Sequence, residues 1–134
     1  MSFLRCAACA AVFLSAACSK PPSEKDVVDS IVSWIGTGDM AAQAWLNHTA
    51  FDRYTRETLD LSAKMLDDQS DQLKQVAPGH PAAVDSAVTK AKDAMAAISR
   101  LIAANDAPDV PATLDSLRAA KATVLAVADS LEQK

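Results

Sequence analysis

Three cysteines, Cys6, Cys9 and Cys18, all lie within the first 18 residues of this 134-residue chain. Cys6-Ala7-Ala8-Cys9 has the Cys-x-x-Cys spacing of a redox-active pair, in which one thiolate can reach the other sulfur. The pair stands in an apolar run, and Arg5 is the only charged side chain among residues 1–19. This order is typical of an export signal that is removed. We therefore expect no redox chemistry from Cys6 and Cys9.

The segment Leu14-Ser15-Ala16-Ala17-Cys18 resembles the lipobox of bacterial lipoproteins, although Ser15 stands where the motif usually has leucine. The resemblance implies cleavage after residue 17 and attachment of palmitate-type acyl chains at Cys18, which would hold the mature chain on a membrane. Ser19 in place of aspartate after the cysteine implies sorting to the outer membrane, with the domain facing the periplasm. A soluble periplasmic or secreted protein is the alternative, because Ser15-Ala16-Ala17 also suits the ordinary signal peptidase.

The charge of the chain limits its partners. The formal net charge is −4, and removal of the signal would make it one unit more negative because Arg5 is lost. An acidic domain lacks the concentrated Lys and Arg that phosphate binding needs, so nucleic acid is not an expected partner. The expected partners are a membrane, through lipid on Cys18, and an envelope protein that the sequence does not identify.

Four helices are expected after a tether at residues 18–22, which contains Pro21-Pro22. They span about 23–46, 50–76, 81–104 and 109–133, separated by clusters of turn-forming residues. Matched lengths and short connections predict an all-α, up-and-down four-helix bundle over residues 23–134. A three-helix array is the alternative. A break of the first helix at Gly36-Thr37-Gly38 also stays open.

Apolar periodicity predicts the inward face of each helix. In the first helix it comprises Val27, Ile31, Trp34, Gly38, Ala41 and Trp45. In the second it comprises Phe51, Tyr54, Thr58, Leu61, Met65, Gln69, Gln72 or Leu73, and Val76. In the third it comprises Val84, Val88, Ala91, Met95, Ile98 and Leu101 or Ile102, and in the fourth Leu114, Leu117, Val124, Ala128 and Leu131. Variants of the capping box are expected at Ser23 with Asp26 and at Thr49 with Asp52.

Residues that could catalyse a reaction or bind a metal do not gather in this pattern. His48 and His80 fall in connections at opposite ends of an up-and-down bundle, where they cannot share an ion. Asp67, Asp68 and Asp71 lie within one helix, whereas a Ca²⁺ loop needs irregular backbone. We therefore expect a protein that is not an enzyme and that has neither a cofactor nor a metal.

Trp34, Trp45 and Tyr54 are the candidate contact residues for a partner or ligand. Trp34 and Trp45 are about three helical turns apart on one face. They could form an exposed aromatic strip that docks a partner, extended by Tyr54, since Trp and Tyr are enriched at interaction hot spots. Two core anchors beside Gly38 are the other interpretation.

The mature domain resembles small helical bacterial proteins of unknown function through Trp34, Trp45-Leu46, Tyr54 and Thr58-Leu59. We expect a non-enzymatic interaction or accessory module at the cell envelope. The alternative is a bundle that binds a small ligand between helices near Trp34 and Trp45. The third and fourth helices carry many alanines, which suit helix formation and could also form an interface with a second copy of the chain.

Overall fold

The computed structural model describes residues 20–134, so the predicted signal at 1–17 and the predicted lipid site at Cys18 lie outside the described residues. Four helices follow one another: α1 spans Glu24–Leu46, α2 spans Asp52–Val76, α3 spans Ala82–Ala103 and α4 spans Val110–Glu132. A short 3₁₀ turn, η1, covers Ala107–Asp109 before α4. The described residues contain no strand.

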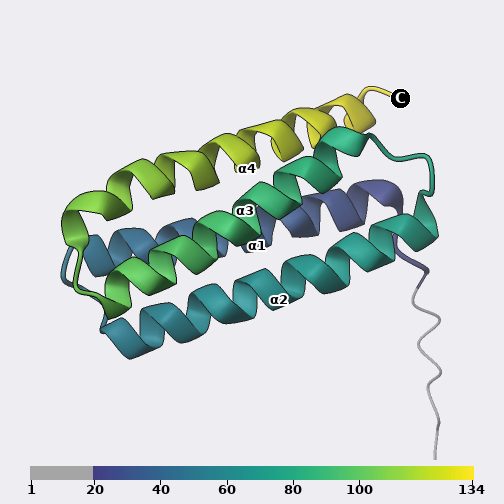
Figure 1. Cartoon of the computed structure of the whole chain (residues 1–134). Helices are drawn as coiled ribbons and strands as arrows, with labels where there is room; N and C mark the ends of the chain where they lie inside the picture. Colours follow the sequence, from purple (N-terminus) through teal and green to yellow (C-terminus); the bar gives the residue numbers. More distant parts are fainter. Residues whose placement is uncertain (1–19) are drawn as a thin grey trace, which may run out of the picture.

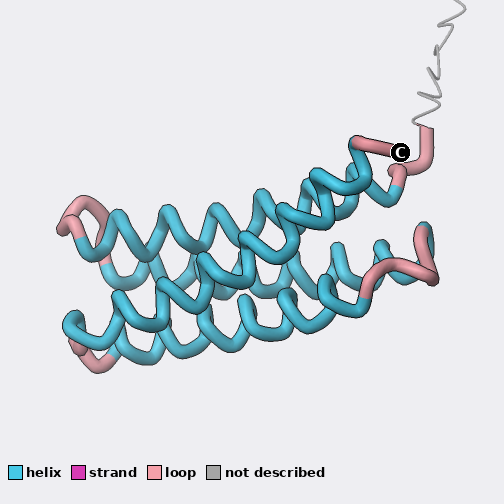
Figure 2. Tube along the Cα trace, turned by 90° about the horizontal axis from the view of Figure 1, so that it is seen from above, coloured by secondary structure: helices cyan, strands magenta, loops and turns pink. Residues whose placement is uncertain are grey.

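The helices form an up-and-down bundle, as the sequence predicted. Successive helices run antiparallel, with the connections α1–α2 and α3–α4 at one end and the connection α2–α3 at the other (Figure 1). Each of α1 and α3 packs against both α2 and α4, which makes α1 and α3 diagonal partners (Figures 1 and 2). The three-helix array is therefore excluded. None of the helices in residues 20–134 is long and apolar enough to cross a membrane.

Helix α1 begins at the predicted capping box. The Asp26 amide donates to Ser23 Oγ at 3.2 Å, and the Ser23 amide donates to Asp26 Oδ2 at 2.8 Å. The helix is continuous through Gly36 and Gly38, so the alternative break does not occur. Gly38 allows a close approach to α3, because a Cβ atom at this position would lie only 2.6 Å from Met95 Cε.

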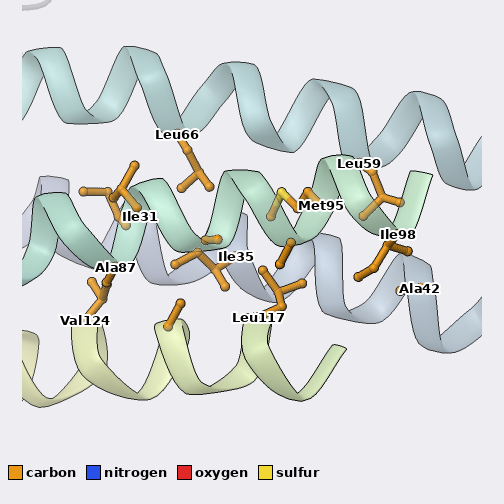
Figure 3. Packing of buried hydrophobic residues seen from close by; sticks show 14 of the residues in the cluster. Ile31, Ile35, Ala42, Leu59, Leu66, Ala87, Met95, Ile98, Leu117 and Val124 are labelled. Carbon is orange, nitrogen blue, oxygen red and sulfur yellow. The ribbon is translucent and has the colours of Figure 1, made fainter. Parts of the chain in front are cut away.

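The core agrees with the predicted faces of α1, α3 and α4. Figure 3 shows Leu59 and Leu66 pointing from α2 into this core, toward side chains of the other helices. The largest fully buried side chains come from all four helices: Ile31, Ile35, Leu59, Leu66, Leu73, Met95, Ile98, Ile102, Leu114, Leu117, Val27 and Val28. Trp34 lies partly buried against this cluster, and Trp45 is 8% exposed within it. Burial of these aliphatic groups drives folding, since the described chain contains no cysteine for a disulfide.

The predicted inward face of α2 is wrong apart from Leu73, which was one of two alternatives with Gln72 and is fully buried. The residues that α2 buries are Thr55, Leu59, Ser62, Leu66 and Leu73. The predicted stripe lies further round the helix, and four of its members are among the exposed large apolar side chains: Phe51, Tyr54, Leu61 and Val76. The prediction failed because the true inward face carries two hydroxyl side chains, whereas the outer flank carries two aromatic ones.

The predicted capping box at Thr49 and Asp52 is also wrong. Helix α2 begins two residues later than that box requires, with Phe51 at the N-cap and no side-chain hydrogen bond to the first turn. Thr49 Oγ1 instead donates to the Ala44 carbonyl at 2.9 Å, which closes the end of α1. Asp52 instead accepts a hydrogen bond from Trp45.

The α1–α2 and α3–α4 connections, which lie at the same end of the bundle, begin with the same helix-ending motif. His48 has φ 58° and Asn105 has φ 54°, and they are the positive-φ residues other than glycine in the described chain. The Thr49 amide donates to the Ala44 carbonyl and the Asp106 amide to the Leu101 carbonyl, each at 2.9 Å. These are the six-to-one hydrogen bonds of Schellman motifs, in which the left-handed position is usually glycine.

Candidate functional site

The residues predicted to contact a partner occupy different environments. Trp34 packs partly buried against the core, about 16 Å along α1 from Trp45. Trp45 is 8% exposed, whereas Tyr54 is 62% exposed. The two tryptophans therefore belong to the core and its margin, and the exposed aromatic surface comes from the start of α2.

A cavity of about 330 Å³ lies at the end of the bundle formed by the connections α1–α2 and α3–α4. We call it the end cavity. Its lining side chains are contributed by α1, the start of α2 and both connections: Trp45, Leu46, His48, Ala50, Phe51, Asp52, Asn105 and Ala107. Trp45 lines the end cavity but Trp34 does not, so the cavity coincides with the predicted pocket near Trp34 and Trp45 at only one of the two tryptophans.

One hydrogen bond joins two of the residues that line the end cavity. Trp45 Nε1 donates to Asp52 Oδ1 at 2.7 Å, which joins the last turn of α1 to the first turn of α2. Because the indole is held in the core, this bond fixes the orientation of the Asp52 carboxylate. A negative side chain in the first helical turn is also favourable toward the helix dipole.

Phe51 forms an exposed aromatic wall of the end cavity. Its exposed fraction is 86%, and Tyr54 follows one turn later on α2. A phenylalanine buries a large apolar area when it is covered, so this exposure leaves a binding group unused in the isolated chain. Sequence reasoning placed Phe51 and Tyr54 on the same inward face and selected only Tyr54 as a contact residue, so it missed Phe51.

Trp45 is the one lining residue that sequence reasoning selected as a contact residue, and the lining side chains that it missed include His48, Phe51, Asp52 and Asn105. One signal was available: His48 and Asn105 each follow the last periodic residue of a helix closely, at a position where glycine is usual. That signal predicts two helix ends, but it does not predict that the two ends meet. Their proximity depends on the antiparallel arrangement of the four helices.

A second hollow lies between α3 and α4. It is a groove of about 560 Å³ lined mainly by small side chains: Ala83, Ser86, Ala87, Lys90, Asp93, Ser116, Ala119, Ala120 and Thr123. These include several of the alanines that we considered for contact with a second copy of the chain. The groove is lined by small side chains together with one lysine and one aspartate, so it contains neither an aromatic side chain nor a cluster of like charges.

His80 lies at the opposite end of the bundle, in the α2–α3 connection (Figure 1). Its side chain is 5% exposed, with Nε2 3.0 Å from Asp85 Oδ2. Burial disfavours the charged ring, but hydrogen bonds to the Ala77 carbonyl and to Asp85 and the negative charges of Asp85 and Glu24 outweigh it, so the pKa of His80 is raised above 6.5. His48 and His80 therefore lie at opposite ends, as expected.

Within residues 20–134, no group of three or more His, Cys, Asp or Glu side chains could hold a metal ion. Of the acidic cluster on α2, Asp67 pairs with Lys92 and Asp71 pairs with Lys74. Such ion pairs are typical of a solvent-exposed helix face, and each contributes little to the stability of the fold.

Comparison of the chain with protein-family models, with curated proteins and with solved structures gives no match.

Proposed function

We propose that this chain is an exported envelope protein, anchored to a membrane by lipid on Cys18, and that its bundle acts as a non-enzymatic interaction module. The end cavity is the docking site. One observation carries the docking part of this proposal: His48, Phe51 and Asn105 each occupy a position where another residue would stabilise the fold better, and all three line the same cavity. Departures from local rules that gather at one place are typical of functional sites.

Phe51 is the strongest of the three departures. At an N-cap, Ser, Thr, Asp or Asn would satisfy a free amide of the first turn and stabilise the helix by about 1 kcal/mol, which phenylalanine cannot do. Because Phe51 is also 86% exposed, its ring adds little to the core. A residue that neither caps the helix nor fills the core is well explained by a contact with another molecule.

The position of the end cavity suits an anchored protein. Lys20, Pro21 and Pro22 lead directly into the start of α1, and the cavity lies at the other end of the same helix. With 23 residues, α1 is about 35 Å long. A lipid on Cys18 would thus place the cavity away from the membrane surface, where a partner can approach it.

The docking proposal is tested by photo-crosslinking in intact cell envelopes. A photoreactive phenylalanine analogue at position 54 should give a discrete adduct, and adding Phe51→Ser to that protein should abolish it. The same analogue at position 125 is the matched control, because Leu125 is 45% exposed on α4 and does not line the end cavity. Equal adducts at positions 54 and 125, or an adduct that survives Phe51→Ser, would contradict the proposal.

Loss of the adduct must not result from unfolding. Phe51→Ser should raise the free energy of unfolding by about 0.5–1 kcal/mol, because serine can cap α2. A variant that is more stable and yet fails to crosslink separates binding from folding. A destabilised Phe51→Ser protein would show that Phe51 has a structural role and would remove the main support of the proposal.

The anchor is tested by fractionation. The full-length protein should remain with membranes after alkaline extraction, whereas the Cys18→Ser variant should lose the lipid-bearing form, detected as a change in mass of the mature chain. Identical masses and fractionation for the two proteins would contradict lipidation, and the soluble periplasmic or secreted alternative would replace it.

A small-ligand-binding bundle is the second candidate, and the volume of the end cavity favours it. About 330 Å³ lies near the lower limit of pockets that hold small molecules, which is about 300 Å³. A macromolecular partner would contact the exposed wall at Phe51 and Tyr54 as well as the cavity, whereas a small ligand would contact the cavity. The crosslinked mass at position 54 therefore distinguishes the two candidates.

A further inference from the structure

We propose that the end cavity receives a cationic side chain of the partner, an arginine, which pairs with Asp52 and stacks on Phe51. This inference rests on the proposed docking function and adds the chemistry of the group that is recognised. It follows from the charge of the cavity, the fixed geometry of its carboxylate and the aromatic wall beside it.

Asp52 is the only acidic or permanently charged side chain among the residues that line the end cavity. Trp45 Nε1 donates a hydrogen bond to Asp52 Oδ1, and no donor among the described residues bonds to Asp52 Oδ2. The carboxylate is thus oriented by a core residue and retains an oxygen that can accept from a donor outside the chain. A donor that carries positive charge makes the stronger hydrogen bond to such a carboxylate.

The cations nearest to Asp52 along α2 are directed elsewhere. Arg53 Nε donates to Glu57 Oε1 at 2.7 Å, and Arg56 Nε lies 3.4 Å from Ser99 Oγ on α3. Asp52 takes part in none of the ion pairs formed within residues 20–134. The described residues therefore supply no lysine or arginine to the cavity, and a cation from a partner meets a carboxylate that has no ion-pair partner among them.

The aromatic wall selects among cations. An exposed carboxylate by itself gives a weak pair, because water screens the charges. A guanidinium is planar and weakly hydrated, so it can stack on an aromatic face while donating to a carboxylate. Phe51 and Asp52 are adjacent in sequence and line the same cavity, which places these two interactions within reach of one arginine side chain.

An anion is the competing occupant, because α2 begins without a side-chain cap, which leaves amides of its first turn without a side-chain acceptor. However, Asp52 places a negative charge in that same first turn, and the end cavity contains no lysine or arginine to offset it. An anionic group would therefore be repelled where a cationic group is attracted, and a direct titration can compare the two.

The inference is tested by NMR on the purified full-length protein in detergent. The indole N–H signals of Trp45 and Trp34 are two separate reporters, one at the end cavity and one on the same helix away from it. N-acetyl-arginine amide should shift the Trp45 signal in a saturable manner and leave the Trp34 signal unchanged. N-acetyl-glutamate amide and N-acetyl-leucine amide are the anionic and neutral probes, and neither should cause that shift.

Asp52→Asn is the decisive variant, because asparagine keeps an oxygen that accepts from Trp45 Nε1 and removes the charge. It should weaken the affinity for N-acetyl-arginine amide by about tenfold, the loss expected for one charge-assisted pair. Asp68→Asn is the matched control, since it makes the same charge change at an exposed site further along α2 and should leave the affinity unchanged. A shift that is unaffected by Asp52→Asn, or that N-acetyl-glutamate amide reproduces, would overturn the inference.

The docking function and the arginine inference can fail separately. If Asp52→Asn keeps the position-54 adduct in envelopes while Phe51→Ser loses it, docking stands and the partner's arginine is refuted. If both variants lose the adduct and Asp52→Asn also loses the arginine-dependent shift, docking and its chemistry are supported together.

Discussion

His80 is held between two hydrogen-bond acceptors, with Nε2 3.0 Å from Asp85 Oδ2 and Nδ1 2.7 Å from the Ala77 carbonyl oxygen. A neutral imidazole has one N–H and can donate to only one of them, whereas the imidazolium donates to both. The side chain is nearly buried, and the arrangement ties the α2–α3 connection to the first turn of α3 through a ring that donates to both acceptors when it is protonated. The stability of this connection should therefore vary with the protonation state of His80.

The first prediction concerns pH. The pKa of His80 in the folded chain is raised above 6.5, so its stabilising contribution is complete below pH 6.5 and is lost as the pH rises through the folded-state pKa. The free energy of unfolding, measured by urea denaturation from pH 6 to pH 9, should therefore fall across that interval. His80→Gln should be less stable than the natural chain by about 1–2 kcal/mol at pH 6, since hydrogen bonds from a charged donor are lost.

The same measurement on His80→Gln provides the control for other titrating groups. The difference between the two proteins should shrink as the pH rises, because the natural chain loses its imidazolium while glutamine does not titrate. A difference that stays constant from pH 6 to pH 9 would show that His80 acts through packing and not through charge.

Helix α2 shows why the sequence predicted the bundle correctly and one of its faces incorrectly. The number of helices, their bounds and three inward faces depend on local periodicity and turn residues, which can be read from one chain. The rotation of α2 depends on which of two flanks packs best against α1 and α3. Its apolar residues favour the flank of Phe51 and Leu61, but the structure buries the flank of Leu59 and Leu66.

A pair of substitutions on α2 tests this rotation. Leu66 is fully buried, so Leu66→Ala should lower the free energy of unfolding by about 2–5 kcal/mol through lost burial and the cavity that remains. Leu61 is 51% exposed, and Leu61→Ala should change it by less than about 0.5 kcal/mol. The two variants remove the same atoms from neighbouring turns, and urea denaturation of each should give this order. A larger loss of stability from Leu61→Ala than from Leu66→Ala would instead support the inward face predicted from the sequence.

The candidate site was less predictable than the fold. Tyr54 and Trp45 could be selected by residue type, but their roles depend on exposure, and the wrong rotation of α2 concealed the exposure of Tyr54. His48 and Asn105 are 57 positions apart in the numbering and meet only because α1 and α3 end on the same side of the bundle. A site assembled from two connections has no local sequence signature, so its existence follows from topology.

Ser62 provides a prediction about the cost of the unusual inward face of α2. Its side chain is fully buried, and Oγ has no hydrogen-bond partner in the described residues. Removing a buried hydroxyl that has no partner, at a position where alanine is also the better helix former, should stabilise the chain. Ser62→Ala should raise the free energy of unfolding by about 1 kcal/mol, measured in urea. A loss of stability would show that Ser62 Oγ makes a bond through an ordered water molecule.

The left-handed residue at the end of α1 gives the last prediction. His48 adopts φ 58°, a conformation that costs a residue with a side chain about 1–2 kcal/mol relative to its usual regions and that glycine adopts freely. The Schellman hydrogen bonds use backbone atoms alone, so His48→Gly keeps them and should raise the free energy of unfolding by about 1 kcal/mol, measured by thermal and urea denaturation. Because His48 also lines the end cavity, the same variant should weaken the position-54 crosslink while the fold becomes more stable. Asn105→Gly is the companion variant, and it should gain less stability because asparagine tolerates this conformation better than histidine does. A His48→Gly protein that is less stable would mean that the imidazole contributes contacts to the fold, and the argument that His48 is retained for binding would then fail.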